Sequence, residues 1–403
     1  MSEWLDSFTK IASSIEKRFD LIKFGVKVRS GWLDPVQIQP YRGHGTPERL
    51  FLKGRVLEYK GITSATDADS MWQNLLNMYR RFDSDEIPGA RLLVRFGDQQ
   101  FEAKTDHEGY FDIVVEPAAP LQLKRVWHEI QLTLIEPKPA SQGRERVVGH
   151  VLVPPPKSEF GVISDIDDTI VLTGATDPLT MARIVVLNNP HTRLPFEGVA
   201  AFYQALRKGG DGAGYNPIFY VSSSPWNLYD LLIDFLNING IPIGPLFLRD
   251  VGLEQDRLIK SDHHEHKLKQ IRTILDTHAD LPFVLIGDSG QEDPEIYREV
   301  LREYPDRIRA IYIRDVSVAE RETSVNKIIE EIRDTGVEMV LVADTVAAAE
   351  HAARKGFITA DALPDIRAEK RKDEQAPTIA EQIPVIAAVT DATTTSEAKS
   401  TQP

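Results

Sequence analysis

A run of polar residues near the middle of the chain follows a short apolar stretch at 160–164. The run is Asp165-Ile166-Asp167-Asp168-Thr169. A carboxylate can attack the phosphorus of a phosphoester when a hard cation neutralises the repulsion between the two anions. A second carboxyl two residues further on, at Asp167, can protonate the leaving alkoxide and later deprotonate a water molecule. The run is therefore a candidate centre for phosphoryl transfer through an aspartyl phosphate.

Three further polar segments follow apolar runs or begin an expected helix. Serines 222–224 follow the apolar run 217–221, and Asp288 follows the run 283–286 with Asp293 close behind. Lys267 is expected at the start of a helix. Ligands of open α/β sheets bind outside the carboxyl ends of the strands, so these groups should converge on one place. Serine hydroxyls and a lysine ammonium suit phosphoryl oxygens, and Mg²⁺ prefers carboxylate oxygens.

The four segments, in this order, resemble the four motifs of the haloacid dehalogenase superfamily of phosphotransferases. The resemblance implies that Asp165 is the nucleophile and Asp167 the acid/base. It implies that Ser222 and Lys267 complete the catalytic set. It also implies a Mg²⁺ ion bound by Asp165, the backbone carbonyl of Asp167, Asp288 and, directly or through water, Asp293.

Neighbouring residues compete for some of these roles. Ser223 and Ser224 lie beside Ser222, which directly follows the expected strand. Lys269 competes with Lys267, and Glu292 could replace Asp293. Asp168 is not a motif position, and we expect it to be structural. Histidines 263, 264 and 266 cannot all face one ion from a single helix start, so we do not interpret them as a metal site.

The sequence around these motifs is similar to the catalytic family of the actin-patch-protein phosphatidate phosphatases, distant relatives of the lipins. The resemblance covers about 155–360, and its segments are 165–170, 188–199, 220–228 and 285–291. It implies hydrolysis of phosphatidate to diacylglycerol and phosphate. A long proline-rich tail of the kind expected in the fungal protein is not present in this sequence, which puts an actin-patch role in doubt.

Candidate substrate contacts accompany these motifs. They are Thr169, Ser223, Arg193, Trp226 and Arg249. For the last three, a role in the core or in a salt bridge is an equal alternative. Thr169 and Ser222 are separated by 52 residues, and Ser222 and Lys267 by 44, so neither gap clearly holds a large cap domain. Such an open site could reach a lipid headgroup at a membrane surface.

Two other functions stay open at this point. The first is a phosphatase of soluble phosphomonoesters or phosphoproteins, because the residues themselves indicate only a phosphomonoesterase. The second is a lipid- or protein-binding module in which the phosphatase fold is inactive. The intact set of carboxylates argues against the second.

The elements that position these residues form two contrasting regions. Residues 30–155 read as short β runs separated by Gly, Asp or Pro, which predicts a β-sandwich accessory domain. Residues 156–362 alternate apolar strand-length runs with amphipathic stretches, which predicts an α/β catalytic domain with a doubly wound parallel sheet, as in haloacid dehalogenases. Apolar residues at helical spacing predict an amphipathic helix in 1–29, and the composition of 363–403 predicts a disordered tail.

The amino-acid composition limits the kinds of partner and chemistry that we expect. The net charge of -14 argues against general nucleic-acid binding, although residues 1–60 hold 11 Lys and Arg against 7 Asp and Glu. No cysteine is present, which excludes disulfide and thiolate chemistry. No apolar run is long enough for a transmembrane helix. We expect a cytoplasmic protein that meets phosphatidate peripherally at a membrane surface; the sequence does not indicate an oligomeric state.

Overall fold

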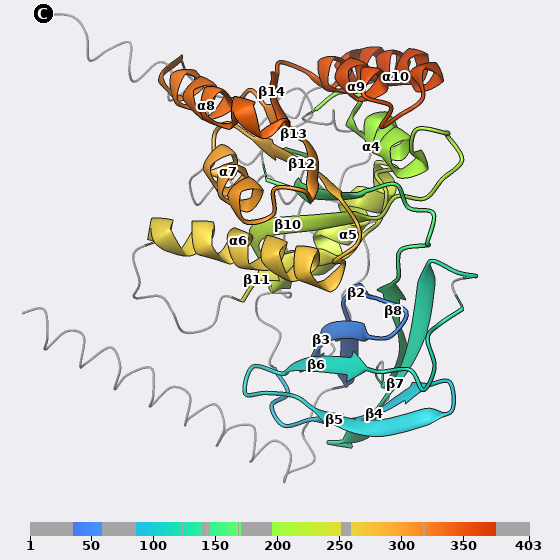
Figure 1. Cartoon of the computed structure of the whole chain (residues 1–403). Helices are drawn as coiled ribbons and strands as arrows, with labels where there is room; N and C mark the ends of the chain where they lie inside the picture. The colour runs from blue at the N-terminus through green and yellow to red at the C-terminus, as the bar shows by residue number, and fades with distance from the viewer. Residues whose placement is uncertain are drawn as a thin grey trace, which may run out of the picture.

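A computed structural model describes residues 35–58, 86–122, 124–138, 143, 145–167, 169–170, 196–250, 259–316 and 319–375. The helix expected in 1–29, Asp168, Arg193 and the end of the chain after 375 lie outside the described residues. The described chain contains a parallel-sheet domain and a β domain, which Figure 1 shows one above the other.

The parallel-sheet domain is built on six strands that all run the same way. They are β9 (Gly161–Asp165), β10 (Ile218–Pro225), β11 (Leu246–Arg249), β12 (Phe283–Asp288), β13 (Ile308–Arg314) and β14 (Glu338–Val342). Their order in the sheet is β11-β10-β9-β12-β13-β14. The first strand, β9, therefore lies at the centre of the sheet. Strands β10 and β11 extend the sheet to one edge, and β12, β13 and β14 extend it to the other. The reversal leaves the carboxyl ends of β9 and β12 side by side, where α/β sheets bind ligands.

Helices cover both faces of this sheet (Figure 1). On one face lie α4 (Val199–Lys208), α5 (Tyr229–Ile238), α9 (Thr345–Arg354) and α10 (Leu363–Gln375). On the other lie α6 (Ile259–Thr277), α7 (Asp293–Glu303) and α8 (Ala319–Ile332). Short 3₁₀ turns η1 (Trp226–Leu228), η2 (Arg333–Thr335) and η3 (Ala360–Ala362) join them. Alternate residues of each strand enter the two cores, as the period of a β-strand requires.

The β domain is a mixed sheet of eight strands. They are β1 (Val36–Pro40), β2 (Gly43–Gly45), β3 (Leu50–Glu58), β4 (Arg91–Phe96), β5 (Gln99–Lys104), β6 (Tyr110–Val115), β7 (Trp127–Glu136) and β8 (Arg146–Leu152). The pattern predicted a sandwich of two sheets, but the strands form one hydrogen-bonded sheet curled around a single core. The physical reason is the length of β3, whose nine residues pair with β1 and β2 on one edge and β6 on the other.

Helix α10 corrects the expected start of the disordered tail at 363. Ile366 is only 1% exposed, so this charged segment has one strong apolar anchor. Its acidic side chains cap α4: Asp373 accepts a hydrogen bond from the Gly198 N–H at 2.8 Å, and Glu369 accepts one from Ala201 at 2.6 Å. The first N–H groups of a helix have no partner inside the helix, so these carboxylates stabilise α4 and order α10.

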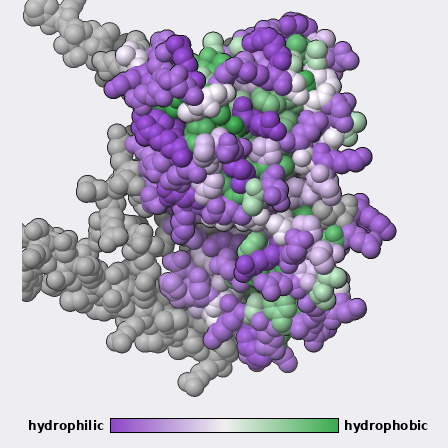
Figure 2. All heavy atoms as spheres, viewed as in Figure 1, coloured by the Kyte–Doolittle hydropathy of each residue, from purple (hydrophilic) through white to green (hydrophobic). Residues whose placement is uncertain are grey.

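On the face shown in Figure 2, hydrophilic residues predominate and apolar residues form small patches. Large apolar side chains that are clearly exposed are isolated ones, such as Val148 and Ile238. None of the described helices has the length and apolar character needed to cross a bilayer.

The two domains share a buried contact between two histidines. Nδ1 of His44, on β2, lies 3.3 Å from Nε2 of His278, which follows α6. His44 also packs against the rings of Phe51 and Phe247. Burial lowers the pKa of His44 to about 4 and, with help from His44 and Arg307, the pKa of His278 to about 3. Both rings are therefore neutral near pH 7.

Because of this histidine pair, the folded protein should be less stable in mild acid. The pKa of each histidine is lower in the folded protein than in the unfolded chain, so the unfolded chain binds more protons as the pH falls below about 6.5. We expect the free energy of unfolding to fall by about 3 kcal/mol between pH 7 and pH 5 on account of this pair. Urea unfolding at several pH values measures the effect, and a double His44→Leu/His278→Leu variant should flatten the slope. An unchanged slope would contradict it.

Candidate active site

Asp165 is the last residue of the central strand β9 and is only 1% exposed. It stands opposite Val221 of β10. The Ser164 hydroxyl donates a hydrogen bond to the Asp165 backbone carbonyl at 2.6 Å and contacts the Tyr203 hydroxyl at 2.7 Å. Strand pairing and this hydroxyl pair therefore fix the backbone that carries the carboxylate.

Lys267 joins Asp165 to a second acid. Its ammonium lies 2.8 Å from Asp165 Oδ1 and 2.7 Å from Asp293 Oδ1. All three side chains are buried, with at most 5% exposed. Burial raises the pKa of Asp165 well above its usual range; Lys267 opposes this rise and the neighbouring carboxylates add to it. Burial alone would lower the pKa of Lys267, but Asp165 and Asp293 hold it above its ordinary value.

Asp288 and Asp293 are positioned by the turn between β12 and α7. Asp288 ends β12, and its Oδ1 accepts hydrogen bonds from the N–H groups of Gly290 at 2.7 Å and Gln291 at 2.9 Å. Asp293 begins α7, and its Oδ2 accepts from the Asp288 N–H at 3.2 Å. A Cβ atom at Gly287 would lie 2.4 Å from Asp293 Oδ2, so only glycine permits this close approach.

These carboxylates fit a hard cation. One oxygen each from Asp165, Asp288 and Asp293 lie within 4.8 Å of one another, and all three residues are buried. Asp165 Oδ2 accepts no hydrogen bond from the described part of the chain. Lys267 supplies a single positive charge against three carboxylates, and buried charges without compensation are costly. The site can therefore hold a divalent metal ion with oxygen ligands.

Asp167 faces the serines at the end of β10. The Ser222 hydroxyl donates to Asp167 Oδ2 at 2.5 Å, and the Ser224 hydroxyl lies 3.3 Å from Oδ1. The Ser222 Oγ also accepts the Ser224 N–H at 2.9 Å. The Ser223 Oγ is buried and has no hydrogen-bond partner in the described chain. Asp167, Ser222 and Ser224 thus form a hydrogen-bonded group.

The structure corrects two expectations about local structure. Strand β10 continues to Pro225, so Ser222 lies within the strand and not after it. Helix α6 begins at Ile259, so Lys267 lies more than two turns inside the helix and not at its start. The competing Lys269 is exposed, whereas Lys267 is buried, because only one of the two lies on the helix face towards Asp165. Glu292 contacts His264 at 3.3 Å and does not join the carboxylates.

The structure does not bring all the residues expected to contact substrate together at the site. Trp226 is 7% exposed and stacks on Tyr41 of the β domain, with 4.2 Å between ring centroids. The Trp226 ring is therefore part of the packing between the two domains. The Nη1 of Arg249, at the end of the edge strand β11, lies 3.3 Å from His263 Nε2, so this guanidinium has a hydrogen-bond partner within the protein. Arg193 lies outside the described residues.

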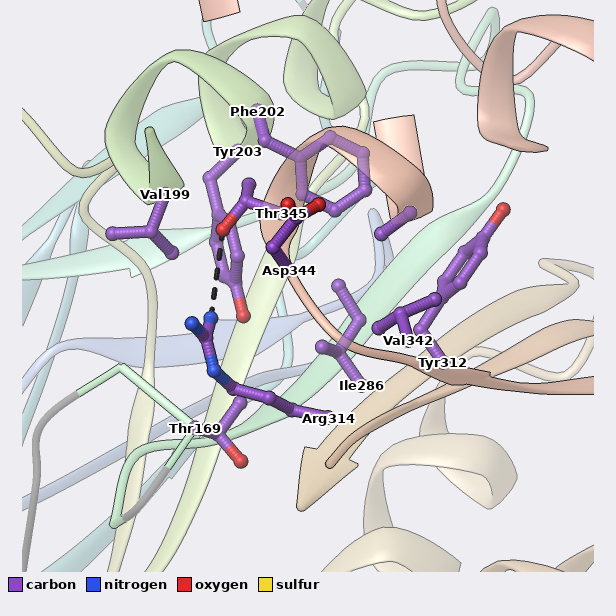
Figure 3. A pocket seen from close by; sticks show the side chains of 11 residues that line it. Thr169, Val199, Phe202, Tyr203, Ile286, Tyr312, Arg314, Val342, Asp344 and Thr345 are labelled. Atoms are coloured by element: carbon purple, nitrogen blue, oxygen red, sulfur yellow. Dashed lines mark hydrogen bonds between the residues drawn. The ribbon is translucent and has the colours of Figure 1, made fainter. Parts of the chain in front are cut away.

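Thr169 is one of the residues that line a small pocket (Figure 3). The pocket measures about 30 Å³, which is room for about one water molecule and too little for a phosphate headgroup. Arg314 points towards Thr345 across it, at 3.5 Å, and stacks on Phe196. Burial lowers the pKa of Arg314 to about 10. We regard this pocket as packing around Arg314.

Two residues of the site escape sequence reasoning. Gln291 accepts a hydrogen bond from Lys267 at 3.2 Å and donates one to the Asp167 backbone carbonyl at 3.1 Å. Arg321, at the start of α8, donates to the backbone carbonyls of Ser289 and Gln291 and forms a two-point ion pair with Glu295. It thereby holds the turn that carries Asp288. Gln291 lies in the segment 285–291 that carries the family resemblance, and this position is the signal that could have indicated it.

Part of the chain is similar in sequence to known proteins. Residues 160–315 match the family described as phosphatidate phosphatase APP1, catalytic domain. Phosphatidate phosphatase APP1 of Saccharomyces cerevisiae is 36% identical over 181 residues, which is 42% of this chain and 30% of the yeast protein. An uncharacterized protein of Schizosaccharomyces pombe is 26% identical over 246 residues, 59% of this chain and 39% of that protein. The chain thus spans about a third of the length of these relatives.

Similarity to solved structures is low. A carbohydrate acetylesterase from Xanthomonas citri aligns with a TM-score of 0.24 and 10% identity over 72% of each chain, and we draw no conclusion from it. The match at 160–315 spans β9 to β13, and with them Asp165, Ser222, Lys267 and Asp288. It confirms the resemblance of the sequence around these motifs to the actin-patch-protein phosphatidate phosphatase catalytic family. Residues 160–315 are therefore similar to the phosphatidate phosphatase APP1 catalytic-domain family.

Proposed function

We propose that this chain is a Mg²⁺-dependent phosphatidate phosphatase of the haloacid dehalogenase type, which hydrolyses phosphatidate to diacylglycerol and phosphate. The observation that carries the proposal is the buried Asp165, held 2.8 Å from Lys267 and grouped with Asp288 and Asp293 at the carboxyl end of a parallel sheet. Residues 156–362 would form the catalytic domain and 30–155 an accessory domain. The protein would act in the cytoplasm, peripherally at a membrane surface.

The first half-reaction transfers the phosphoryl group to Asp165. A carboxylate oxygen of Asp165 attacks phosphorus, and the bond from phosphorus to the glycerol oxygen breaks. Asp167 gives its proton to that oxygen, so diacylglycerol leaves as a neutral alcohol. Lys267 keeps Asp165 in one orientation and offers positive charge to the phosphoryl oxygens. The product on the enzyme is an acyl phosphate of Asp165.

The second half-reaction hydrolyses this acyl phosphate. Asp167, now a carboxylate, takes a proton from water, and the water oxygen attacks phosphorus. The bond from phosphorus to Asp165 breaks, which releases phosphate and restores both acids. Ser222 and Ser224 hold Asp167 throughout by the hydrogen bonds at 2.5 and 3.3 Å. The same residue can therefore serve as acid and then as base without moving.

Mg²⁺ would be held by Asp165 and Asp288, with Asp293 directly or through water, and when bound it would reduce the repulsion between the substrate phosphate and Asp165. The Asp167 backbone carbonyl is a fourth candidate ligand. It accepts a hydrogen bond from Gln291 Nε2 at 3.1 Å. Both Asp293 oxygens already have partners, Lys267 and the Asp288 N–H, which favours the contact through water.

The assignment of the lipid rests on the relative in yeast, whose name is phosphatidate phosphatase APP1. Phosphate release should therefore be measured from phosphatidate in mixed micelles, beside lysophosphatidate, diacylglycerol pyrophosphate and soluble phosphomonoesters, with Mg²⁺ or EDTA. The proposal expects Mg²⁺-dependent release from phosphatidate above all others. Release from soluble esters alone would make the chain a soluble phosphomonoesterase. No release from any of them would favour a binding module.

Metal removal gives a prediction that does not depend on activity. We expect Mg²⁺ at about one hundred times its dissociation constant to raise the free energy of unfolding by about 2.7 kcal/mol over EDTA, because the ion binds only the folded protein. Thermal unfolding with and without Mg²⁺ measures this. The shift should nearly disappear in Asp288→Asn and persist in the control Asp334→Asn, an exposed acid in η2. An equal shift in both variants would contradict the site.

A further inference from the structure

The segment that carries Ser222 and Ser224 lies against the β domain. We call residues 222–228, from the end of β10 through the turn η1, the serine loop. On one side its hydroxyls hold Asp167. On the other side its aromatic and amide side chains, Trp226 and Asn227, contact the β domain. The loop is thus held from both domains at once.

Tyr41 makes the first of these contacts. Its ring is stacked on Trp226, with 4.2 Å between centroids and 12° between planes, and lies 4.5 Å from the ring of Tyr229. Tyr41 is 2% exposed, and its backbone N–H donates to the Lys53 carbonyl at 2.9 Å. The ring therefore projects from a fixed backbone into the parallel-sheet domain. Stacked pairs of this kind contribute about 0.5–1.5 kcal/mol beyond the apolar area they bury.

Arg55 makes the second contact. Its Nη1 donates to Asn227 Oδ1 at 3.3 Å, its Nε to the Glu108 carbonyl at 2.8 Å, and its Nη2 to Glu86 at 2.8 Å. Arg55 is 7% exposed, and its guanidinium stacks on the Tyr110 ring at 4.3 Å. Because each nitrogen of the guanidinium has a partner, its position is defined, and so is that of the Asn227 amide.

We propose that Tyr41 and Arg55 are positioning residues of the phosphatase reaction. They hold the serine loop so that Ser222 and Ser224 keep Asp167 aligned. Asn227 is three residues from Ser224 and Trp226 is two, so a shift of η1 moves both hydroxyls. The β domain then supplies part of the catalytic geometry from outside the segment 160–315. This inference rests on the proposed function, because it assigns Asp167 a proton-transfer role.

A shift of the loop should affect turnover more than substrate binding. Misplacement of a catalytic group by about 1 Å can cost about a hundredfold in rate. Loosening one of two supports should cost less, so we expect kcat to fall about tenfold while KM changes less than about twofold. A general weakening of the fold would instead lower the fraction of active protein without a specific change in the serine loop.

The test uses the full chain and phosphatidate in mixed micelles with Mg²⁺. Tyr41→Leu and Arg55→Met remove the two contacts, and Tyr41→Phe keeps the ring stack. Phe51→Leu is the matched control, because Phe51 is also an aromatic residue of the β domain at the domain contact but packs on His44. We expect the kcat loss in the first two variants, near-normal kcat in Tyr41→Phe and Phe51→Leu, and faster amide hydrogen exchange at 222–228 only where kcat falls.

Arg55 and Asn227 also allow a double-mutant cycle. If they act through one contact, Asn227→Ala should lower kcat as Arg55→Met does, and the double variant should be no worse than either single one. Unchanged kcat and exchange in Tyr41→Leu and Arg55→Met, or equal losses in Phe51→Leu, would overturn the inference. A wild-type protein that releases no phosphate would contradict the proposed function, and exchange at 222–228 would still decide whether the β domain holds the loop.

Discussion

Asp165→Asn is expected to abolish phosphate release and leave the fold intact. An amide oxygen cannot form the acyl phosphate, so the loss should approach that seen on removal of other covalent nucleophiles, about a millionfold in kcat. The fold should survive because the amide removes a negative charge from a buried group of acids. Lys267 keeps its partner Asp293 at 2.7 Å. We therefore expect a melting temperature in EDTA equal to or above that of the wild type.

Two measurements make this prediction sharp. Steady-state phosphate release gives the loss of turnover, and circular dichroism gives the fold and the melting temperature. Asp334→Asn, the same substitution at an exposed position, should change neither. Residual activity in Asp165→Asn within tenfold of the wild type would exclude Asp165 as the nucleophile, whatever the function of the site.

The sequence predicted the parts of the site that depend on strand ends. Asp165 and Asp288 follow apolar runs that form the neighbouring central strands β9 and β12, so a topological rule was sufficient to bring them together. Asp293 was predicted at the same place because it closely follows Asp288 in the sequence. The alternation of strands and helices likewise indicated the parallel sheet. These features are local, because each needs only the order of elements along the chain.

The parts that escaped prediction depend on tertiary contacts. The sequence predicts Lys267 at a helix start, whereas α6 begins at Ile259; the charged residues before Lys267 carry no helical apolar pattern that would mark these first turns. For Trp226 a headgroup contact and a core role are equal alternatives from the sequence, because nothing in its own segment indicates that Tyr41, 185 positions earlier in the chain, covers it. Helix α10 falls within the predicted tail, because contacts with α4, Asp344 and Glu350 that the sequence does not show order its charged side chains.

Lys267→Met is expected to destabilise the protein more than any other substitution at the site. Removing one partner of a buried ion pair leaves an uncompensated charge, which typically costs about 3–5 kcal/mol. Here the ammonium serves two buried acids, Asp165 and Asp293. Urea unfolding in EDTA at pH 7 measures the loss. Lys269→Met is the matched control, because Lys269 is exposed on the same helix and its loss should cost less than about 0.5 kcal/mol.

The pH dependence of this loss has a definite sign. Lys267 lowers the pKa of Asp165, which burial raises, so the substitution should raise that pKa further. A carboxyl whose folded pKa lies above its unfolded value binds more protons in the folded state, and stability then falls as the pH rises. The deficit of Lys267→Met relative to Lys269→Met should therefore be small near pH 4 and grow towards pH 7. A deficit that shrinks with rising pH would contradict the assignment.

Magnesium should compensate for part of the same loss. With the ammonium gone, the carboxylates of Asp165 and Asp293 have no other buried positive charge among the contacts described at the site. A divalent cation then supplies the missing charge, so Mg²⁺ should stabilise Lys267→Met more than it stabilises the wild type. Turnover should stay low, because Mg²⁺ cannot also replace the hydrogen bond from Lys267 to Gln291 or orient Asp165 Oδ1. Stability and turnover would thus separate, which distinguishes a lysine that balances charge from one that also aligns the nucleophile.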